Sequence, residues 1–197
     1  KLLYNQHEDK AMEEELELRR YIDDWLVEWK NNPNHKPALI KGIRQSGKTY
    51  SIDRFIKKNY DVYIYLNFWT NPDLISVFDG ELDADKIIRE LSVKMPLPDL
   101  VEGRTAFFFD EVQDCPKVIN SMKYFCENAP QYHIACAGSL LGIALAKPSS
   151  FPVGKVNFMQ IDPMTFTEFL LANGDENLAN YLETVNTIEP IPDAFFN

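Results

Sequence analysis

Residues 42–49 read Gly-Ile-Arg-Gln-Ser-Gly-Lys-Thr. This octapeptide matches the pattern GxxxxGK[ST] at every position. Its glycines permit a tight backbone curl in which successive N–H groups converge on a phosphate, and a helix that begins beside it adds the positive end of its dipole. A short apolar run over 38–40 precedes the octapeptide and a helical pattern over 47–59 follows it. The stretch therefore predicts a loop that binds nucleotide phosphates.

The polar residues of this loop have predicted parts in the site. Lys48 is expected to reach the β- and γ-phosphate oxygens, and the Thr49 hydroxyl is expected to ligate Mg²⁺. The Arg44 side chain is left with two orientations, toward solvent or toward the γ-phosphate. The expected nucleotide-binding positions are Gly42, Arg44, Gln45, Ser46, Gly47, Lys48, Thr49 and Tyr50.

A second apolar strand, predicted over 105–109, is followed directly by Asp110 and Glu111. Asp110 is predicted to hold Mg²⁺. Glu111 is predicted to deprotonate a water that attacks the γ-phosphate, and its alternative role is to cap the following turn. The next strand, over 132–137, leads to Ser139, which is predicted to contact the γ-phosphate or the attacking water, or to cap a helix that begins at Leu140. Lys48, Glu111 and Ser139 form the predicted catalytic set.

Strands that alternate with helices, without hairpin turns between them, predict an α/β fold with a mostly parallel sheet. Helices are predicted over about 13–30, over 84–94 and from Pro116 to about 128, and a further strand over 62–66. Thr165 and Glu168 form a capping box for a short helix that stops at Gly174. No guanine-specificity motif Asn-Lys-x-Asp occurs, which favours ATP over GTP.

Charge and composition exclude several classes of function. The 197 residues carry 20 basic and 30 acidic side chains and a net charge of -10, which argues against direct nucleic-acid binding. Residues 31–60 reverse this balance with seven basic and one acidic side chain, as a local anion site or a solvated lysine-rich helix face would. No signal peptide and no apolar run of about 20 residues is present, so we expect a cytoplasmic protein without membrane contact. Three cysteines and three histidines are assigned no metal or catalytic role.

Together these motifs resemble a group of prokaryotic AAA-superfamily ATP-binding proteins. The resemblance rests on Trp29-Lys30, on the octapeptide and on four further stretches: 109–113 (Phe-Asp-Glu-Val-Gln), 137–141 (Ala-Gly-Ser-Leu-Leu), 151–155 (Phe-Pro-Val-Gly-Lys) and 163–170 (Pro-Met-Thr-Phe-Thr-Glu-Phe-Leu). It implies a P-loop NTPase three-layer sandwich, with a five-stranded sheet that has an extra strand between the Walker A and Walker B strands. It also implies ATP and Mg²⁺ as ligands and a companion C-terminal domain. Lys155 stands where many relatives carry arginine.

The expected organisation is an N-terminal helical segment over 1–30, an ATPase domain over 31–174 and the start of a further region over 175–197. The sequence does not begin with Met, and the aromatic pair Phe195-Phe196 stands just before its last residue, so we expect it to be part of a longer protein. None of its six arginines follows the predicted strand over 105–109 in the sequence. In phosphoryl transfer, an arginine that neutralises charge in the transition state accelerates the reaction. We therefore expect Mg-dependent ATP binding with slow hydrolysis, coupled to an absent C-terminal domain or to a protein partner. The alternatives are an ATP-dependent binding switch with little hydrolysis and, less favoured, nucleic-acid processing through the absent domain.

Overall fold

The structure is a computed structural model that describes residues 20–139 and 152–185. These residues divide into two compact units, 20–164 and 165–185. Within the described ranges, no helix combines the length and the apolar character that a membrane crossing needs. The expected helix that begins at Leu140 and the first part of the helix expected over 13–30 lie outside the described residues.

The first unit is built on a five-stranded sheet in which every neighbouring pair is parallel. Its strands are β1 (Ala38–Gly42), β2 (Val62–Asn67), β3 (Thr105–Asp110), β4 (His133–Ser139) and β5 (Asn157–Ile161). They lie in the order β2-β3-β4-β1-β5, so β4 separates the strand before the phosphate loop from the strand that ends in Asp110. This order confirms the extra strand that the resemblance implies.

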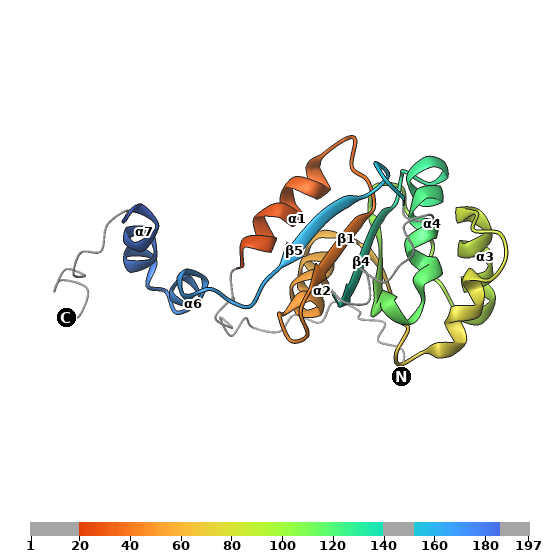
Figure 1. The fold of residues 1–197 in the computed structure, drawn as a ribbon. Coiled ribbons are helices and arrows are strands. Elements are labelled where there is room, and N and C mark those ends of the chain that lie inside the picture. Colours follow the sequence, from red (N-terminus) through yellow and green to blue (C-terminus); the bar gives the residue numbers. More distant parts are fainter. Residues whose placement is uncertain (1–19, 140–151, 186–197) are drawn as a thin grey trace. The chain divides into compact units, whose positions relative to one another are not determined.

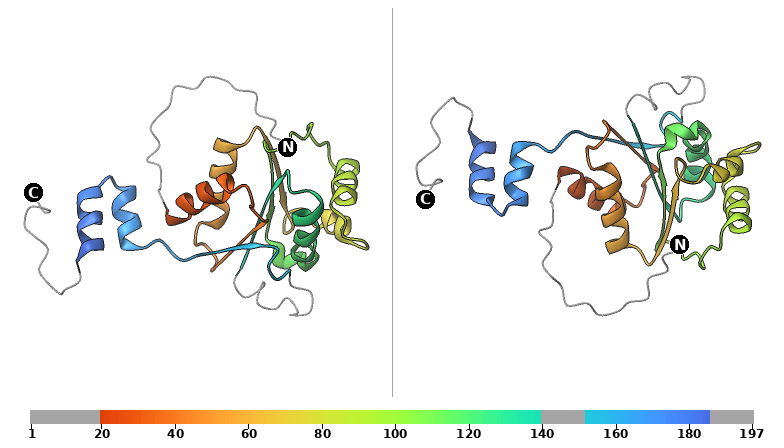
Figure 2. Two further views of the ribbon diagram at one scale, coloured as in Figure 1. Left: turned by 90° about the horizontal axis from the view of Figure 1, so that it is seen from above. Right: turned by 90° about the horizontal axis from the view of Figure 1, so that it is seen from below.

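Helices cover both faces of this sheet, as the two views of Figure 2 and the ribbon of Figure 1 show. Helices α1 (Tyr21–Asn31) and α2 (Lys48–Asn59) pack on one face, and α3 (Ala84–Lys94) and α4 (Pro116–Asn128) pack on the other. Two 3₁₀ helices, η1 (Pro72–Phe78) and η2 (Val112–Asp114), connect strands to helices. The α/β three-layer sandwich is confirmed.

The central strand β3 shows why the sequence forms this arrangement. Successive side chains of a strand point to opposite faces, so a parallel strand that is covered on both faces reads as a continuous apolar run. Phe107 and Phe109 belong to the core under α3 and α4, whereas Phe108 belongs to the core under α1 and α2, and all three are fully buried. The run of three phenylalanines therefore joins both halves of the sandwich.

The predicted elements are confirmed for β1 to β4 and for α2 to α4, with end points that differ by one or two residues. β5 is a strand that the residue pattern did not predict, because it is short and lies at the sheet edge with an alternating exposure. The domain boundaries at 31–174 stay a prediction.

The second unit contains α6 (Phe166–Ala172) and α7 (Glu176–Thr184). The predicted capping box is confirmed, because the Glu168 N–H donates to the Thr165 hydroxyl at 3.1 Å and the Thr165 N–H donates to the Glu168 carboxylate at 2.8 Å. Phe166 and Phe169 stack at 6.3 Å between ring centroids and are 62% and 49% exposed. The expected stop is also found, since α6 ends just before Gly174.

A cluster of aromatic rings surrounds His133 at the amino end of β4. The His133 ring stacks on His35 at 3.7 Å between centroids, and Trp29 and Tyr60 lie at 5.1 and 5.2 Å. Burial lowers the pKa of His133 from 6.5 to about 4, and the neighbouring His35 acts in the same direction. The surroundings of His133 therefore favour the neutral form of its imidazole over the protonated form.

This cluster gives a prediction about acid stability. The folded-state pKa of His133 lies below its unfolded value, so the unfolded chain binds the proton first and stability falls as the pH drops from 6.5 toward 4. Between pH 7.5 and 5.0 we expect His133 alone to lower the free energy of unfolding by about 2 kcal/mol. Urea titrations of the wild type and of His133→Phe at both pH values measure this difference. Equal losses of stability in the two proteins would contradict the prediction.

Candidate nucleotide-binding site

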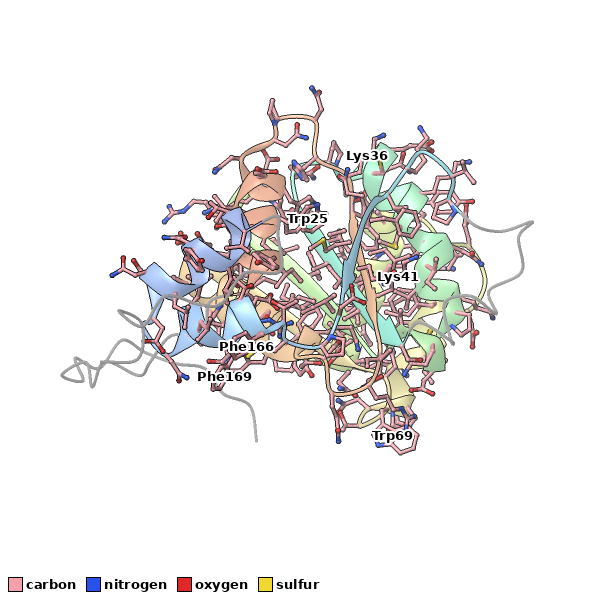
Figure 3. All side chains as sticks on the ribbon, turned by 60° about the vertical axis from the view of Figure 1, so that its left-hand side comes forward. Trp25, Lys36, Lys41, Trp69, Phe166 and Phe169 are labelled. Atoms are coloured by element: carbon pink, nitrogen blue, oxygen red, sulfur yellow. The ribbon has the colours of Figure 1, made fainter. Side chains whose placement is uncertain are left out.

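The predicted site residues lie at the carboxyl ends of the parallel strands. Gly42 at the end of β1 is the register partner of Ser139 at the end of β4, and Asn67 at the end of β2 is the partner of Asp110 at the end of β3. Figure 3 shows Lys36, just before β1, and Trp69, just after β2, at opposite ends of the sheet. The site lies at the end marked by Trp69, where open parallel sheets usually bind ligands.

The loop between β1 and α2 has the backbone form of an anion-binding nest. Gly47 and Gln45 have φ angles of 86° and 63°, and α2 begins at Lys48. The N–H groups in the first turn of a helix have no partner within the helix, and the main-chain bond that closes the first turn here runs from the Ser51 N–H to the Gly47 carbonyl at 3.0 Å. The loop therefore presents N–H groups and a helix N-terminus to the same place, which suits a phosphate.

Gly42 is required by close packing at the root of this loop. A Cβ at this position would lie 2.3 Å from the Ile161 carbonyl oxygen of β5 and 2.7 Å from its side chain. Any other residue would push β1 and β5 apart. The first glycine of the motif thus sets the position of the loop on the sheet.

The Lys48 side chain folds back over the loop. Its ammonium donates to the carbonyl oxygens of Gly42 at 3.0 Å and Ile43 at 2.6 Å. Burial lowers the pKa of Lys48, while the nearby Glu111 and Asp110 carboxylates act in the opposite direction. The ammonium is thus held against the loop by two neutral acceptors, and an anionic oxygen would be a stronger partner for it.

Thr49 and Asp110 join the two motifs. The Thr49 hydroxyl donates to the Asp110 carboxylate at 3.1 and 3.3 Å. Two side chains from β2 reach the same carboxylate, the Tyr65 hydroxyl at 2.9 Å and the Asn67 carboxamide at 3.3 Å. A hydroxyl and a carboxylate in contact are the hard oxygen donors that Mg²⁺ takes from proteins alongside substrate phosphates, so the residues present fit this metal.

Burial governs the titration of this carboxylate. It raises the pKa of Asp110 above its usual value, against the hydrogen bonds from Tyr65 and Thr49 that favour the ionised form. Tyr65 is also affected, because its burial and the adjacent Asp110 raise the pKa of the phenol to about 12. Tyr65 therefore stays a hydrogen-bond donor to Asp110 across the physiological range. Sequence reasoning missed Tyr65 and Asn67, although their place at the end of a predicted parallel strand is a signal that points to this edge.

Glu111 follows Asp110 in a left-handed backbone conformation, with φ 55° and ψ 44°. For a residue with a side chain this conformation costs about 1–2 kcal/mol. The Glu111 N–H donates to Asp110 at 3.0 Å, and the Glu111 carboxylate accepts from the carboxamide of Gln113. The strained turn therefore presents a second carboxylate beside the one that faces Thr49.

Arg20 is a further residue at the loop that the sequence did not reveal. Its side chain is 6% exposed, and it donates to the Ser46 carbonyl at 3.0 Å and to the Asp162 carbonyl at 2.9 Å. A Cβ on Gly47 would lie 3.1 Å from its guanidinium. Arg20 thus ties the phosphate loop to the chain that leaves β5. Ser46 and Asp162 lie 26 and 142 positions from Arg20 in the sequence, so no local pattern predicts these contacts.

The remaining predicted positions are distributed around the loop. Arg44, Gln45 and Tyr50 are exposed, and Arg54 lies over the Tyr50 ring at 5.4 Å. Ser46 is buried, and its hydroxyl donates to the Ile43 carbonyl at 3.0 Å.

Lys155 does not lie at this site. It precedes β5 at the amino end of the sheet and pairs with Glu127 at 2.9 Å, so the length of a strand separates it from Ser139.

A parallel sheet with a GxxxxGK[ST] loop between its first strand and the following helix is the structure of the P-loop NTPase class. A family profile described as an AAA domain matches residues 34–170, which cover β1 to β5 and most of α6. The chain belongs to this family of AAA domains and is an ATP-binding protein of the AAA superfamily.

Two solved structures are among those similar to the chain. One is the Walker-type ATPase PABY2304 of Pyrococcus abyssi, with 16% identity, a TM-score of 0.48 and coverage of 87% of this chain and 64% of that chain. The other is the ORC1 protein of Aeropyrum pernix in complex with DNA, with 15% identity, a TM-score of 0.46 and coverage of 94% and 53%. The chain thus spans less than two thirds of either neighbour. No curated protein matches it.

Proposed function

We propose that the chain binds ATP with Mg²⁺ at the carboxyl edge of the sheet and hydrolyses it slowly. The observation that carries this proposal is the contact between Thr49 and Asp110, because it brings the phosphate loop and the acidic strand end to one point. The nest at 42–49 binds the phosphates, Lys48 binds the β- and γ-phosphate oxygens, and Thr49 and Asp110 hold the metal.

Glu111 is the general base in this proposal. It follows Asp110 directly, and its carboxylate accepts from Gln113, whereas the Asp110 carboxylate accepts from Thr49. In this proposal one carboxylate serves the metal and the other serves the water. A positioned general base typically contributes about 10²–10⁴-fold to the rate of the reaction. Ser139 lies next to Gly42 in register and is proposed to contact the γ-phosphate or that water.

The slow rate follows from where the described arginines lie. Arg20 is buried against two carbonyls, while Arg54 and Arg104 are paired with Asp23 and Asp61. Arg44 is in the loop but exposed, and Arg89 is exposed on α3. An arginine finger supplies about 10³–10⁵-fold in related phosphoryl transfers, so we propose that a partner or a further domain supplies this charge.

We also propose that the nucleotide state is coupled to such a domain or partner. The exposed, stacked pair of Phe166 and Phe169 on α6 offers apolar area of the kind that a protein contact buries. A binding switch with little hydrolysis remains the second outcome of the experiments below.

Removal of the metal tests the proposed role of Asp110. We expect chelation of Mg²⁺ by EDTA to lower ATP turnover at least about 100-fold, since the metal supplies several kcal/mol of charge stabilisation. Asp110→Asn should lose turnover to a similar extent with Mg²⁺ present, and EDTA should lower it little further. Phosphate release assays on both proteins measure these rates.

The matched control is Asp99→Asn, which removes the same charge from an exposed loop and should keep the wild-type response to Mg²⁺. Turnover that is equal with Mg²⁺ and with EDTA would refute the metal site. ATP binding without any turnover in the wild type would select the binding switch instead.

A further inference from the structure

Gln113 is a polar residue beside the site, and the proposed function assigns it no role. It lies two positions after Glu111 in η2 and is half-buried. Glu111, in the left-handed conformation, precedes η2, and the Asp114 N–H closes this turn on the Glu111 carbonyl at 3.0 Å. The Gln113 carboxamide nitrogen donates to the Glu111 carboxylate and, at 3.3 Å, to Asp114.

The other end of the same carboxamide reaches a different strand. The Gln113 side-chain oxygen accepts from the main-chain N–H of Ser139 at 3.0 Å. A carboxylate only accepts and a main-chain N–H only donates, so a single orientation of the carboxamide satisfies both contacts. A flip by 180° would set donor against donor and acceptor against acceptor. Gln113 is therefore a directional bridge between Glu111 and the end of β4.

The bridge ends next to the phosphate loop. Ser139, at the end of β4, is the register partner of Gly42, the first residue of the loop. Gln113 therefore connects the Glu111 carboxylate to the strand end that lies beside the phosphate loop. A glutamate has three side-chain torsions and without this bond would occupy several rotamers. Misplacement of a reacting group by about 1 Å can lower a rate about 100-fold.

We propose that Gln113 is a positioning residue for the hydrolysis of ATP, which holds the Glu111 carboxylate at a fixed place relative to the end of β4. This inference rests on the proposed function, because it acts through Glu111 as the base. Within the described residues, the hydrogen bonds of Gln113 go to Glu111, Asp114 and Ser139, and none goes to the loop at 42–49 or to Asp110. Gln113 therefore acts on the rate of hydrolysis and leaves the affinity for ATP unchanged.

Two substitutions separate the ends of the bridge. Gln113→Leu removes both contacts, whereas Gln113→Glu keeps an acceptor for the Ser139 N–H but sets a second carboxylate against Glu111. We expect both variants of the full chain to lose about tenfold to 100-fold in kcat, the effect of losing one hydrogen bond to a charged group. ATP affinity should stay within about twofold of wild type. Hydrogen exchange of the Ser139 amide should accelerate in Gln113→Leu and stay slow in Gln113→Glu.

The matched control is Gln131→Leu, which makes the same change at the opposite end of β4 and should turn over ATP at the wild-type rate. A double-mutant cycle with Glu111→Gln, followed in single turnover with enzyme in excess, tests the route of the effect. With Glu111 replaced, Gln113→Leu should change the residual rate by less than about twofold.

The outcomes distinguish this inference from the function on which it rests. If the wild type hydrolyses ATP and Glu111→Gln does not, but Gln113→Leu and Gln113→Glu are as fast as the control, the positioning role is wrong and the proposed function stands. An equal loss of rate from Gln113→Leu with and without Glu111 also overturns the inference. A wild type that binds ATP but shows no turnover overturns hydrolysis and this inference together.

Discussion

Substitution of Lys48 by alanine is expected to weaken ATP binding at least about 100-fold, or about 2.7 kcal/mol. The Lys48 ammonium lies at 2.6 and 3.0 Å from two loop carbonyls and is the cation proposed to bind the β- and γ-phosphate oxygens. Its removal leaves the β- and γ-phosphate oxygens without the ammonium that binds them in the proposed site. The fold should change little, because the side chain is only partly buried and packs in neither core.

Isothermal titration with ATP and Mg²⁺ measures this loss, and circular dichroism checks the fold. Lys57→Ala is the matched control, since Lys57 is an exposed lysine at the far end of the same helix and pairs with Asp53. Its ATP affinity should be that of the wild type. Lys48→Arg should recover only part of the affinity, because the planar guanidinium does not occupy the place of a compact ammonium. If Lys48→Ala binds ATP as tightly as Lys57→Ala does, the loop is not the phosphate site.

Substitution of Glu111 by glutamine is expected to separate binding from hydrolysis. The carboxamide has the same shape and still accepts the Gln113 N–H through its oxygen, but it takes no proton from water. We expect kcat to fall about 100-fold or more while the affinity for ATP stays within about threefold. The variant should therefore retain unhydrolysed ATP.

Rapid gel filtration of the variant after incubation with labelled ATP shows whether the retained nucleotide is ATP or ADP. Glu102→Gln, which makes the same exchange in an exposed turn, should retain ADP as the wild type does. Wild-type turnover by Glu111→Gln would remove Glu111 from the role of base and would favour its alternative role as a cap of the following turn.

Local signals were sufficient for much of this fold. The strand–loop–helix around 42–49, the buried strand that ends at Asp110 and the capping box at Thr165 are each specified by residues within a few positions of one another. In such stretches turn chemistry, periodicity and capping favour the same structure. The confirmed elements are of this kind.

Contacts between distant segments could not be predicted in this way. The Arg20 contacts with Ser46 and Asp162, and the bridge from Gln113 to Ser139, depend on strand order and register. The residue pattern indicated a parallel sheet, whereas the strand order came from a family resemblance. His35 stacks on His133, although nothing in the sequence around either histidine predicts this contact. Side-chain partners of this kind appear only once the strands are placed.

In the proposed site one loop, 42–49, wraps a triphosphate next to Asp110 and Glu111. The most direct test follows the main-chain amide resonances of the chain in a ¹⁵N NMR titration with a non-hydrolysable ATP analogue and Mg²⁺. We expect saturable shifts that are largest at Gly47, Lys48 and Thr49, with smaller shifts at Glu111 and Ser139. Saturable binding that leaves these amides unmoved and shifts residues elsewhere would contradict this expectation.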